Sequence, residues 1–187
     1  MLDIILPMLS WFWGLFVGWL YLFASPIWNF QVMWIIIPIW LAWFFGEFFQ
    51  EKKGTSFGNA ISNGVVPFWV GLDWMRLLVN GILEGKMAWS PLLVFKFLIC
   101  LGVFAYGAFI LVQGVRGRHI VRYVGRIREI TYAMVVFTPI IYGIVPLSMR
   151  YFLSIAFFFP VFYFLIEFID LKMPNPKAFD MDESPHR

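Results

Sequence analysis

The longest apolar stretch of the chain covers residues 4–49 and contains a single charged side chain, that of Glu47. As one α-helix this stretch would be about 69 Å long, roughly twice the 30 Å of hydrocarbon in a bilayer. The chain must therefore fold back within it. The predicted turn is at Ser25 and Pro26, because serine is a good N-cap and proline a good first helical residue. The sequence thus predicts two membrane-spanning helices before residue 50.

The composition indicates the same architecture for the rest of the chain. Hydrophobic residues make up 61% of the 187 residues and charged residues 13%, against roughly 45–50% and 25% in soluble domains. The mean hydropathy is +0.81. We therefore expect an all-α, polytopic transmembrane helix bundle, with residues 1–171 as one membrane domain and residues 172–187 as a polar tail. About six spans are expected, at residues 4–23, 27–49, 57–84, 91–114, 130–147 and 150–170.

A basic segment between the fourth and fifth expected spans sets the orientation of the chain. Residues 116–129 carry five arginines, and loops rich in lysine and arginine face the cytoplasm. With six spans both termini are cytoplasmic, as are Lys52 and Lys53; if residues 57–84 did not cross, these lysines would lie outside. The first residues lack a basic segment and a cleavage site, so we expect the first span to be retained. The cell (cytoplasmic) membrane is the expected location.

The third expected span, residues 57–84, is less apolar than the others and carries the best candidates for function. Ionisable groups inside a bilayer cost several kcal/mol unless they are buried, paired or hydrated. At about 100° per residue, the polar side chains of this segment fall within a sector of roughly 140°. They form a polar stripe of Asn59, Asn63, Asp73, Arg76, Asn80 and Glu84.

Three interpretations of the polar stripe differ in what it contacts. In the leading one the stripe holds helices together, and Asp73 and Arg76 neutralise each other because they are three residues apart. A hydrated pathway or binding site would instead depend on Pro67, which removes a backbone hydrogen bond and is expected to kink or break the helix. In the third interpretation the helix lies at the membrane surface with its stripe in water.

The arginines of the basic segment are expected to contact lipid. A helical arrangement places Arg118, Arg122 and Arg126 on one stripe, with apolar side chains opposite. Such a helix would lie among anionic headgroups, each arginine contributing about 1 kcal/mol. Docking of a soluble acidic partner is the alternative. The candidate residues for lipid or partner docking are Arg116, Arg118, Arg122, Arg126 and Arg128.

Three carboxylates lie at expected helix ends on the cytoplasmic side, where they oppose the negative end of the helix dipole. They belong to Glu47, Glu167 and Asp170. We expect each to have a basic partner such as Lys52 or Lys172. A cation held jointly by Glu47 and Glu167 is an alternative.

The sequence carries no metalloprotease, dithiol or nucleotide-binding motif. HExxH, CxxC and glycine-rich phosphate loops are absent, so we do not expect an enzyme. His119 and His186 lie in the basic segment and the tail, and Cys100 lies in an apolar span, so neither a metal site nor a cofactor is expected. The net charge of +3 reflects orientation in the membrane rather than nucleic-acid binding.

A short chain made almost wholly of spans is typical of a non-catalytic integral membrane subunit of a larger membrane assembly. This is the leading functional hypothesis, with membrane lipids and either protein partners or further copies of the chain as expected contacts. The alternative is a small homo-oligomeric ion channel or transporter that conducts along the polar stripe of the third span.

Overall fold

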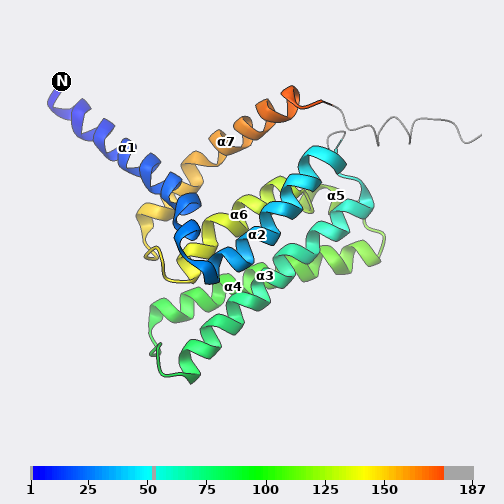
Figure 1. Ribbon diagram of the computed structural model, residues 1–187, viewed down its shortest axis with the longest axis horizontal. Helices are drawn as coiled ribbons and strands as arrows, with labels where there is room; N and C mark the ends of the chain where they lie inside the picture. Colours follow the sequence, from blue (N-terminus) through cyan, green and yellow to red (C-terminus); the bar gives the residue numbers. More distant parts are fainter. Residues whose placement is uncertain (1, 52–53, 175–187) are drawn as a thin grey trace, which may run out of the picture.

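The computed structural model describes residues 2–51 and 54–174, with side chains from residue 5 onward. Within these ranges the protein is all-helical and has no strand. The order of the helices along the chain is shown in Figure 1. They are α1 (Leu2–Ala24), the 3-10 helix η1 (Ser25–Trp28), α2 (Phe30–Phe45), the π-helix η2 (Gly46–Gln50), α3 (Phe57–Leu83), α4 (Pro91–Val115), α5 (Val121–Val124), α6 (Ile127–Ile141) and α7 (Met149–Lys172).

Five stretches of helix in the described part of the chain are long and apolar enough to cross a membrane. They are Ile5–Trp28, Phe30–Gln50, Phe57–Leu83, Pro91–Val115 and Met149–Lys172. Each begins and ends close to a span that the sequence predicts. The structure therefore supports a multi-pass helical membrane protein.

The expected span at residues 130–147 has a different form. α6 has 15 residues, about 22 Å of helix, which is shorter than the hydrocarbon core of about 30 Å. The helix ends at Ile141, and the chain then turns through Gly143, whose φ of +77° lies in the left-handed region that favours glycine. The sixth span stays a prediction, because length and composition support five among the described residues.

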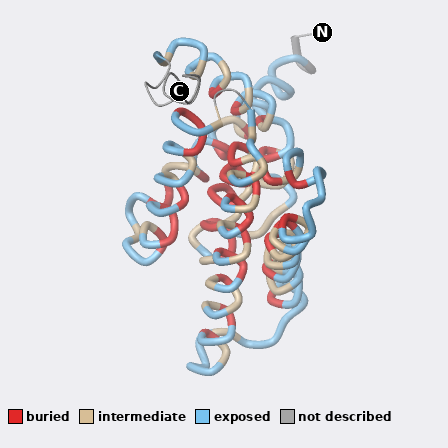
Figure 2. Tube along the Cα trace, turned by 90° about the vertical axis from the view of Figure 1, so that its right-hand side faces the viewer, coloured by how far each residue is buried: buried red, intermediate tan, exposed pale blue. Residues whose placement is uncertain are grey.

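α6 is nevertheless the centre of the fold. Most of its residues are buried, and it packs against α1, α2, α3 and α7. The apolar core forms two clusters around it, one shared with α2, α3 and α4 and the other with α1 and α7. In the second cluster the indole of Trp19 donates a hydrogen bond to the hydroxyl of Tyr132 (3.0 Å). Figure 2 shows the buried residues along the inner faces of the helices.

The turn between α1 and α2 differs in detail from the prediction. Ser25 is not the N-cap of the second long helix, because it begins the short helix η1 and is buried there. The N-cap of α2 is Asn29, whose side-chain oxygen accepts hydrogen bonds from the backbone N–H groups of Gln31 and Val32 (3.1 and 3.3 Å). Asparagine offers the same kind of acceptor as serine, and it stands where the helix begins.

α3 and α4 form a closely packed antiparallel hairpin, and Ser90 caps α4 as the sequence predicts. Two glycines allow the close approach. A Cβ atom on Gly71 would lie 2.6 Å from the backbone nitrogen of Phe104, and one on Gly107 would overlap the backbone of Phe68. Small residues of this kind let helix backbones meet in membrane bundles.

α1 runs across the common direction of the other long helices, and its first half extends away from them (Figure 1). Its second half packs on α6 and α7, where Leu15, Trp19 and Leu22 are buried. Residues 5–13, which we call the α1 arm, are all exposed. α1 therefore does not form a close hairpin with α2, although the two helices are consecutive.

The bundle has two ends that carry different groups. The arginine end, where α2 and α7 finish and α3 and α6 begin, comprises residues 46–51, 54–57, 116–128 and 166–172. The distal end comprises residues 29–34, 76–91 and 141–149. Lys96, near the start of α4, donates a hydrogen bond to the carbonyl of Ile141 (3.1 Å), so α6 finishes beside the distal end of α4.

Candidate functional site

Three side chains from three helices meet at the arginine end. Arg128, in the first turn of α6, donates from Nε to Oε1 of Glu47 (2.8 Å), and its Nη2 bonds the same oxygen. Its Nη1 donates to Oε2 of Glu167 on α7 (2.6 Å). Arg128 and Glu47 are buried, whereas the side chain of Glu167 is 47% exposed. We call these three residues the Arg128 clamp, because they join α2, α6 and α7.

The clamp provides the basic partner of two of the three predicted carboxylates, Glu47 and Glu167. Glu47 and Glu167 do share a cation, but it is the guanidinium of Arg128 rather than a bound ion or a lysine. A guanidinium suits this position because its fixed fork of donors can meet two carboxylates at once. Lys172 lies instead over the ring of Phe168, 5.7 Å from its centroid, and Lys52 lies outside the described residues.

The π-helical turn at the end of α2 positions Glu47. η2 follows α2 directly and carries Gly46 and Glu47 inward, both buried. A Cβ atom on Gly46 would lie 3.3 Å from the side chain of Ile127, the residue before Arg128. The close contact between these two helix ends therefore depends on the missing side chain at Gly46. Single π-turns inside helices often occur at functional sites.

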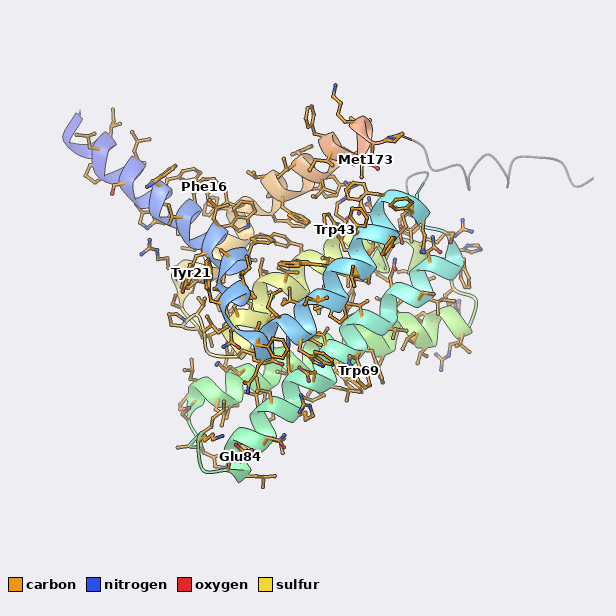
Figure 3. All side chains as sticks on the ribbon, in the orientation of Figure 1. Phe16, Tyr21, Trp43, Trp69, Glu84 and Met173 are labelled. Atoms are coloured by element: carbon orange, nitrogen blue, oxygen red, sulfur yellow. The ribbon has the colours of Figure 1, made fainter. Side chains whose placement is uncertain are left out.

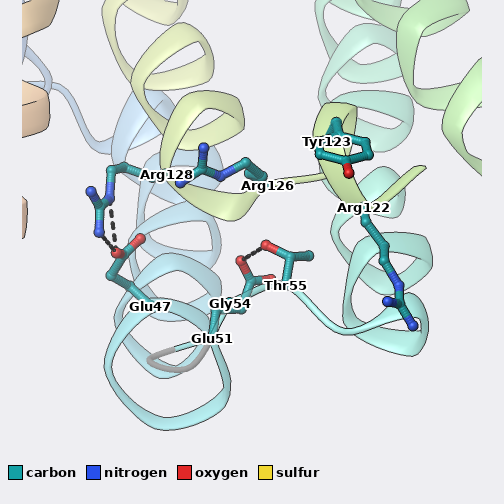
Figure 4. A pocket seen from close by; sticks show the side chains of 8 residues that line it. All are labelled: Glu47, Glu51, Gly54, Thr55, Arg122, Tyr123, Arg126 and Arg128. Atoms are coloured by element: carbon teal, nitrogen blue, oxygen red, sulfur yellow. Dashed lines mark hydrogen bonds and ion pairs between the residues drawn. The ribbon is translucent and has the colours of Figure 1, made fainter. Parts of the chain in front are cut away.

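A cavity of about 300 Å³ opens beside the clamp (Figure 4). Its walls come from the end of α2, the segment before α3 and the segment around α5. It is lined by Glu47, Glu51, Gly54, Thr55, Arg122, Tyr123, Arg126 and Arg128. Carboxylates and guanidinium groups thus face the same space at the end of the bundle.

Two arginines beside this cavity are held by the protein itself. Nη2 of Arg126 donates to the hydroxyl of Tyr163 (3.1 Å), and its Nη1 pairs with Glu129 (3.4 Å). Burial lowers the pKa of Arg126. The hydrogen bond to Tyr163 and the charge of Glu129 raise it by more than burial lowers it, so the pKa lies above its usual value. Burial likewise lowers the pKa of Arg128, and the two clamp carboxylates more than offset it. Both guanidinium groups therefore stay protonated.

The five candidate arginines divide into two groups. Arg116, Arg118 and Arg122 are exposed, whereas Arg126 and Arg128 turn toward the bundle. The expectation of one helix bearing Arg118, Arg122 and Arg126 is wrong, because α5 covers only Val121–Val124. Glycine explains the difference: Gly117 has a φ of +69°, and Gly125 ends α5 against the backbone of α3.

The polar stripe of α3 is divided between the two ends of the bundle. At the arginine end, the side-chain amide of Asn63 donates to Glu51 (2.5 Å) and to the backbone carbonyl of Gly125 (2.8 Å). The amide of Asn59 donates to the carbonyl of Gln50 (3.2 Å). These bonds tie the start of α3 to the end of α2 and to the loop before α6.

At the distal end, Asp73 links two groups. Its Oδ1 pairs with Nη2 of Arg76 (2.6 Å), which confirms the predicted neutralisation of this pair. Its Oδ2 accepts a hydrogen bond from the hydroxyl of Tyr142 (2.6 Å), just after α6.

The remaining stripe residues face an open cavity at the distal end. Asn80 and Glu84 are exposed, and Glu84 pairs with Lys86 (2.6 Å). Figure 3 shows Glu84 at the far end of α3. The distal cavity measures about 580 Å³. It is lined by Phe30, Gln31, Trp34, Arg76, Leu77, Asn80, Gly81, Glu84, Lys86, Met87 and Tyr142.

The middle of α3 separates these two polar regions. Between Asn63 and Asp73 the helix carries no ionisable side chain, and Pro67 and Val70 are buried. The sequence predicts a kink or a break at Pro67. The helix does not break there, because α3 continues from Phe57 to Leu83, and the kink stays a prediction. The neighbours of Pro67, Gly64 and Gly71, let α4 pack closely on either side of the proline.

Among the described residues, no group of three or more His, Cys, Asp or Glu side chains is placed to hold a metal ion. No protein-family model, curated protein or solved structure matches the chain. The function must therefore be inferred from the geometry.

Two tyrosines of these networks escaped the sequence analysis. Tyr142 and Tyr163 each place a hydroxyl on a charged group. The only available signal was that a buried tyrosine needs a polar partner. That signal is weak here, because tyrosine is common at membrane interfaces for other reasons.

Proposed function

We propose that the protein is a non-catalytic integral membrane subunit of a larger membrane assembly. The α1 arm is the observation that carries this proposal. Five large side chains of the arm are more than half exposed: Leu6, Met8, Leu9, Trp11 and Trp13. The arm extends away from the other helices (Figure 1). A helix segment that extends away from its own bundle is not stabilised by packing on that bundle, so we expect it to pack on helices of other chains.

The arrangement of the charged groups favours a structural role over catalysis. Each member of the Arg128 clamp is engaged by another member. Asp73 is engaged in the same way by Arg76 and Tyr142. A general acid or base must reach a substrate proton, and these groups face one another instead. We therefore place their role in holding the helices together.

The arginine end is proposed to face the cytoplasm, with both termini on that side and the protein in the cell membrane. The exposed basic residues of this end support the orientation, since basic loops stay on the cytoplasmic side. Arg116, Arg118 and Arg122 are the arginines free to meet anionic headgroups, each contributing about 1 kcal/mol. An acidic soluble partner at the same three residues is the alternative.

Site-directed crosslinking tests the assembly proposal. A photoreactive amino acid replaces Leu9 or Trp13 in the arm; the control positions are Leu98 and Leu101, which are exposed on α4. We expect one defined crosslinked product from the arm positions in native membranes and none from α4. Arm positions that yield no protein product would show that the arm faces lipid alone, and the proposal would fail.

A small homo-oligomeric ion channel or transporter is the second candidate. The observation that favours it is the exposed distal part of the polar stripe, Arg76, Asn80 and Glu84, which copies of the chain could line together. Flux into liposomes would be compared between the parent, Asp73→Asn and Asn80→Leu. Flux that is lost in both variants supports the channel. No flux in the parent, with stoichiometric partners retained in mild detergent, supports the subunit.

A further inference from the structure

A second cavity lies further along the same two helices as the distal cavity. The second cavity measures about 230 Å³ and is lined by residues 35–42 of α2 and residues 65–70 of α3. The distal cavity uses residues 30–34 of α2 and residues 76–84 of α3. Since α2 and α3 run in opposite directions, the two cavities follow each other along this helix pair, and together we call them the α2–α3 groove. Its distal part is polar and its inner part is apolar.

Arg76 is held ready for a ligand in the polar part of the groove. Its Nε and Nη2 bond Oδ1 of Asp73, and Tyr142 occupies the other oxygen of that carboxylate. The guanidinium is thereby fixed, while its Nη1 bonds no described residue. The Arg76 side chain is 65% exposed and lines the cavity. A fixed guanidinium with free donors is suited to a phosphate group.

A second set of groups in the cavity suits a positive charge. Glu84 is eight residues after Arg76, about 12 Å further toward the membrane surface. The rings of Phe30 and Trp34 are largely exposed on the facing helix, and aromatic faces attract ammonium groups. Arg76 and Lys86 are balanced by Asp73 and Glu84. A nearly neutral lining favours a ligand that carries both signs of charge.

We propose that the α2–α3 groove binds one zwitterionic phospholipid. Its phosphate lies on Arg76, its ammonium group faces Glu84 and Trp34, and an acyl chain lies in the apolar part of the groove. This lipid site is separate from the exposed arginines at the other end of the bundle. It also does not depend on whether the protein is a subunit or a channel.

Native mass spectrometry tests the site directly. The protein in detergent is mixed with equal amounts of phosphatidylethanolamine and phosphatidylglycerol, and the retained lipid is counted. Arg76→Gln removes the side chain that would bind the phosphate; Lys172→Gln is its control, with the same charge change at an exposed position of the other end. Ala42→Trp fills the apolar part of the groove; Ala105→Trp is its control, at an exposed position of α4. Glycerophosphoethanolamine, which has no acyl chains, tests the headgroup alone.

We expect the parent and both controls to retain one phosphatidylethanolamine per chain. Arg76→Gln and Ala42→Trp should each lower retention about tenfold or more, as the loss of a charged hydrogen bond or of a buried chain predicts. Ala42→Trp is a surface change, so it tests the groove even if Arg76→Gln does not fold. Unchanged retention in either variant overturns the proposal. So does equal retention of phosphatidylglycerol, or equal binding of glycerophosphoethanolamine.

Discussion

Arg128 and Glu47 are 81 positions apart in the sequence, and Nε of Arg128 lies 2.8 Å from Oε1 of Glu47. Both side chains are less than a tenth exposed. The pair joins the end of α2 to the start of α6, and Glu167 adds α7 to the same contact. The short central helix is thus fixed at the arginine end by charge as well as by its apolar packing.

Neutralising the two clamp carboxylates should have unequal effects on stability. Glu47→Gln leaves the buried Arg128 without its main counter-ion, and breaking a buried pair costs about 3–5 kcal/mol. Glu167→Gln should cost about 1 kcal/mol or less, because that side chain is half exposed. Unfolding by sodium dodecyl sulfate in mixed micelles measures both. Equal losses for the two variants would mean that burial does not distinguish the two contacts.

Enlarging one glycine of α4 should separate the α3–α4 hairpin. In Gly107→Ala the added methyl group meets the backbone of Phe68, and overpacking of this kind costs about 1–3 kcal/mol. Gly102→Ala is the matched control in the same helix, since nothing lies within 4 Å of the added atom. The same unfolding assay compares them. A neutral Gly107→Ala would show that the hairpin can open at no cost.

Removing the hydroxyl of Tyr142 should destabilise the distal end of the bundle. This hydroxyl donates a hydrogen bond to Oδ2 of Asp73 (2.6 Å) and so joins the chain just after α6 to α3. A hydrogen bond to a charged group contributes about 1.5–3 kcal/mol, so Tyr142→Phe should lose about that much in the same unfolding assay. Tyr123→Phe, at an exposed position, is the control. Equal stabilities of the two variants would contradict the contact with Asp73.

Cysteine labelling should place the two ends of the bundle on opposite sides of the membrane. In a Cys100→Ala background, we expect Lys86→Cys and Met149→Cys to react from one side and Arg118→Cys from the other. The side from which Met149→Cys reacts shows whether the chain crosses the membrane between the arginine segment and α7, because α6 is the helix between them. Reaction of Met149→Cys from the side of Arg118→Cys would leave the six-span arrangement without support.

The long helices are predictable from the sequence because a helix that crosses the hydrocarbon core needs a continuous apolar run of about 20 residues. Ser90 and Pro91, for example, mark the start of α4 by local chemistry alone. α6 could not be read in this way. Its residues continue to look apolar as far as Leu147, but Gly143 turns the chain and the helix is covered by its neighbours on most sides. Burial by protein removes the length requirement that lipid imposes.

The polar network was only partly predictable, because sequence spacing reports neighbours on one helix and not between helices. The pair of Asp73 and Arg76 follows from their spacing of three residues. The partner of Glu47 does not, since any of several basic residues could have reached it. The polar stripe likewise forms one feature in the sequence, although in the structure Asn63 bonds groups at one end of the bundle and Asp73 bonds groups at the other.

The distance along the chain between Glu47 and Arg128 has a consequence for biogenesis. A ribosome releases the carboxylate long before the guanidinium that neutralises it, and Glu167 comes later still. An incomplete chain that ends within α4 has all the apolar helices up to that point but an uncompensated charge at the end of α2. The final arrangement is therefore reached only after α7 has been made, and products truncated before α7 should differ from longer ones in how they are recognised and removed.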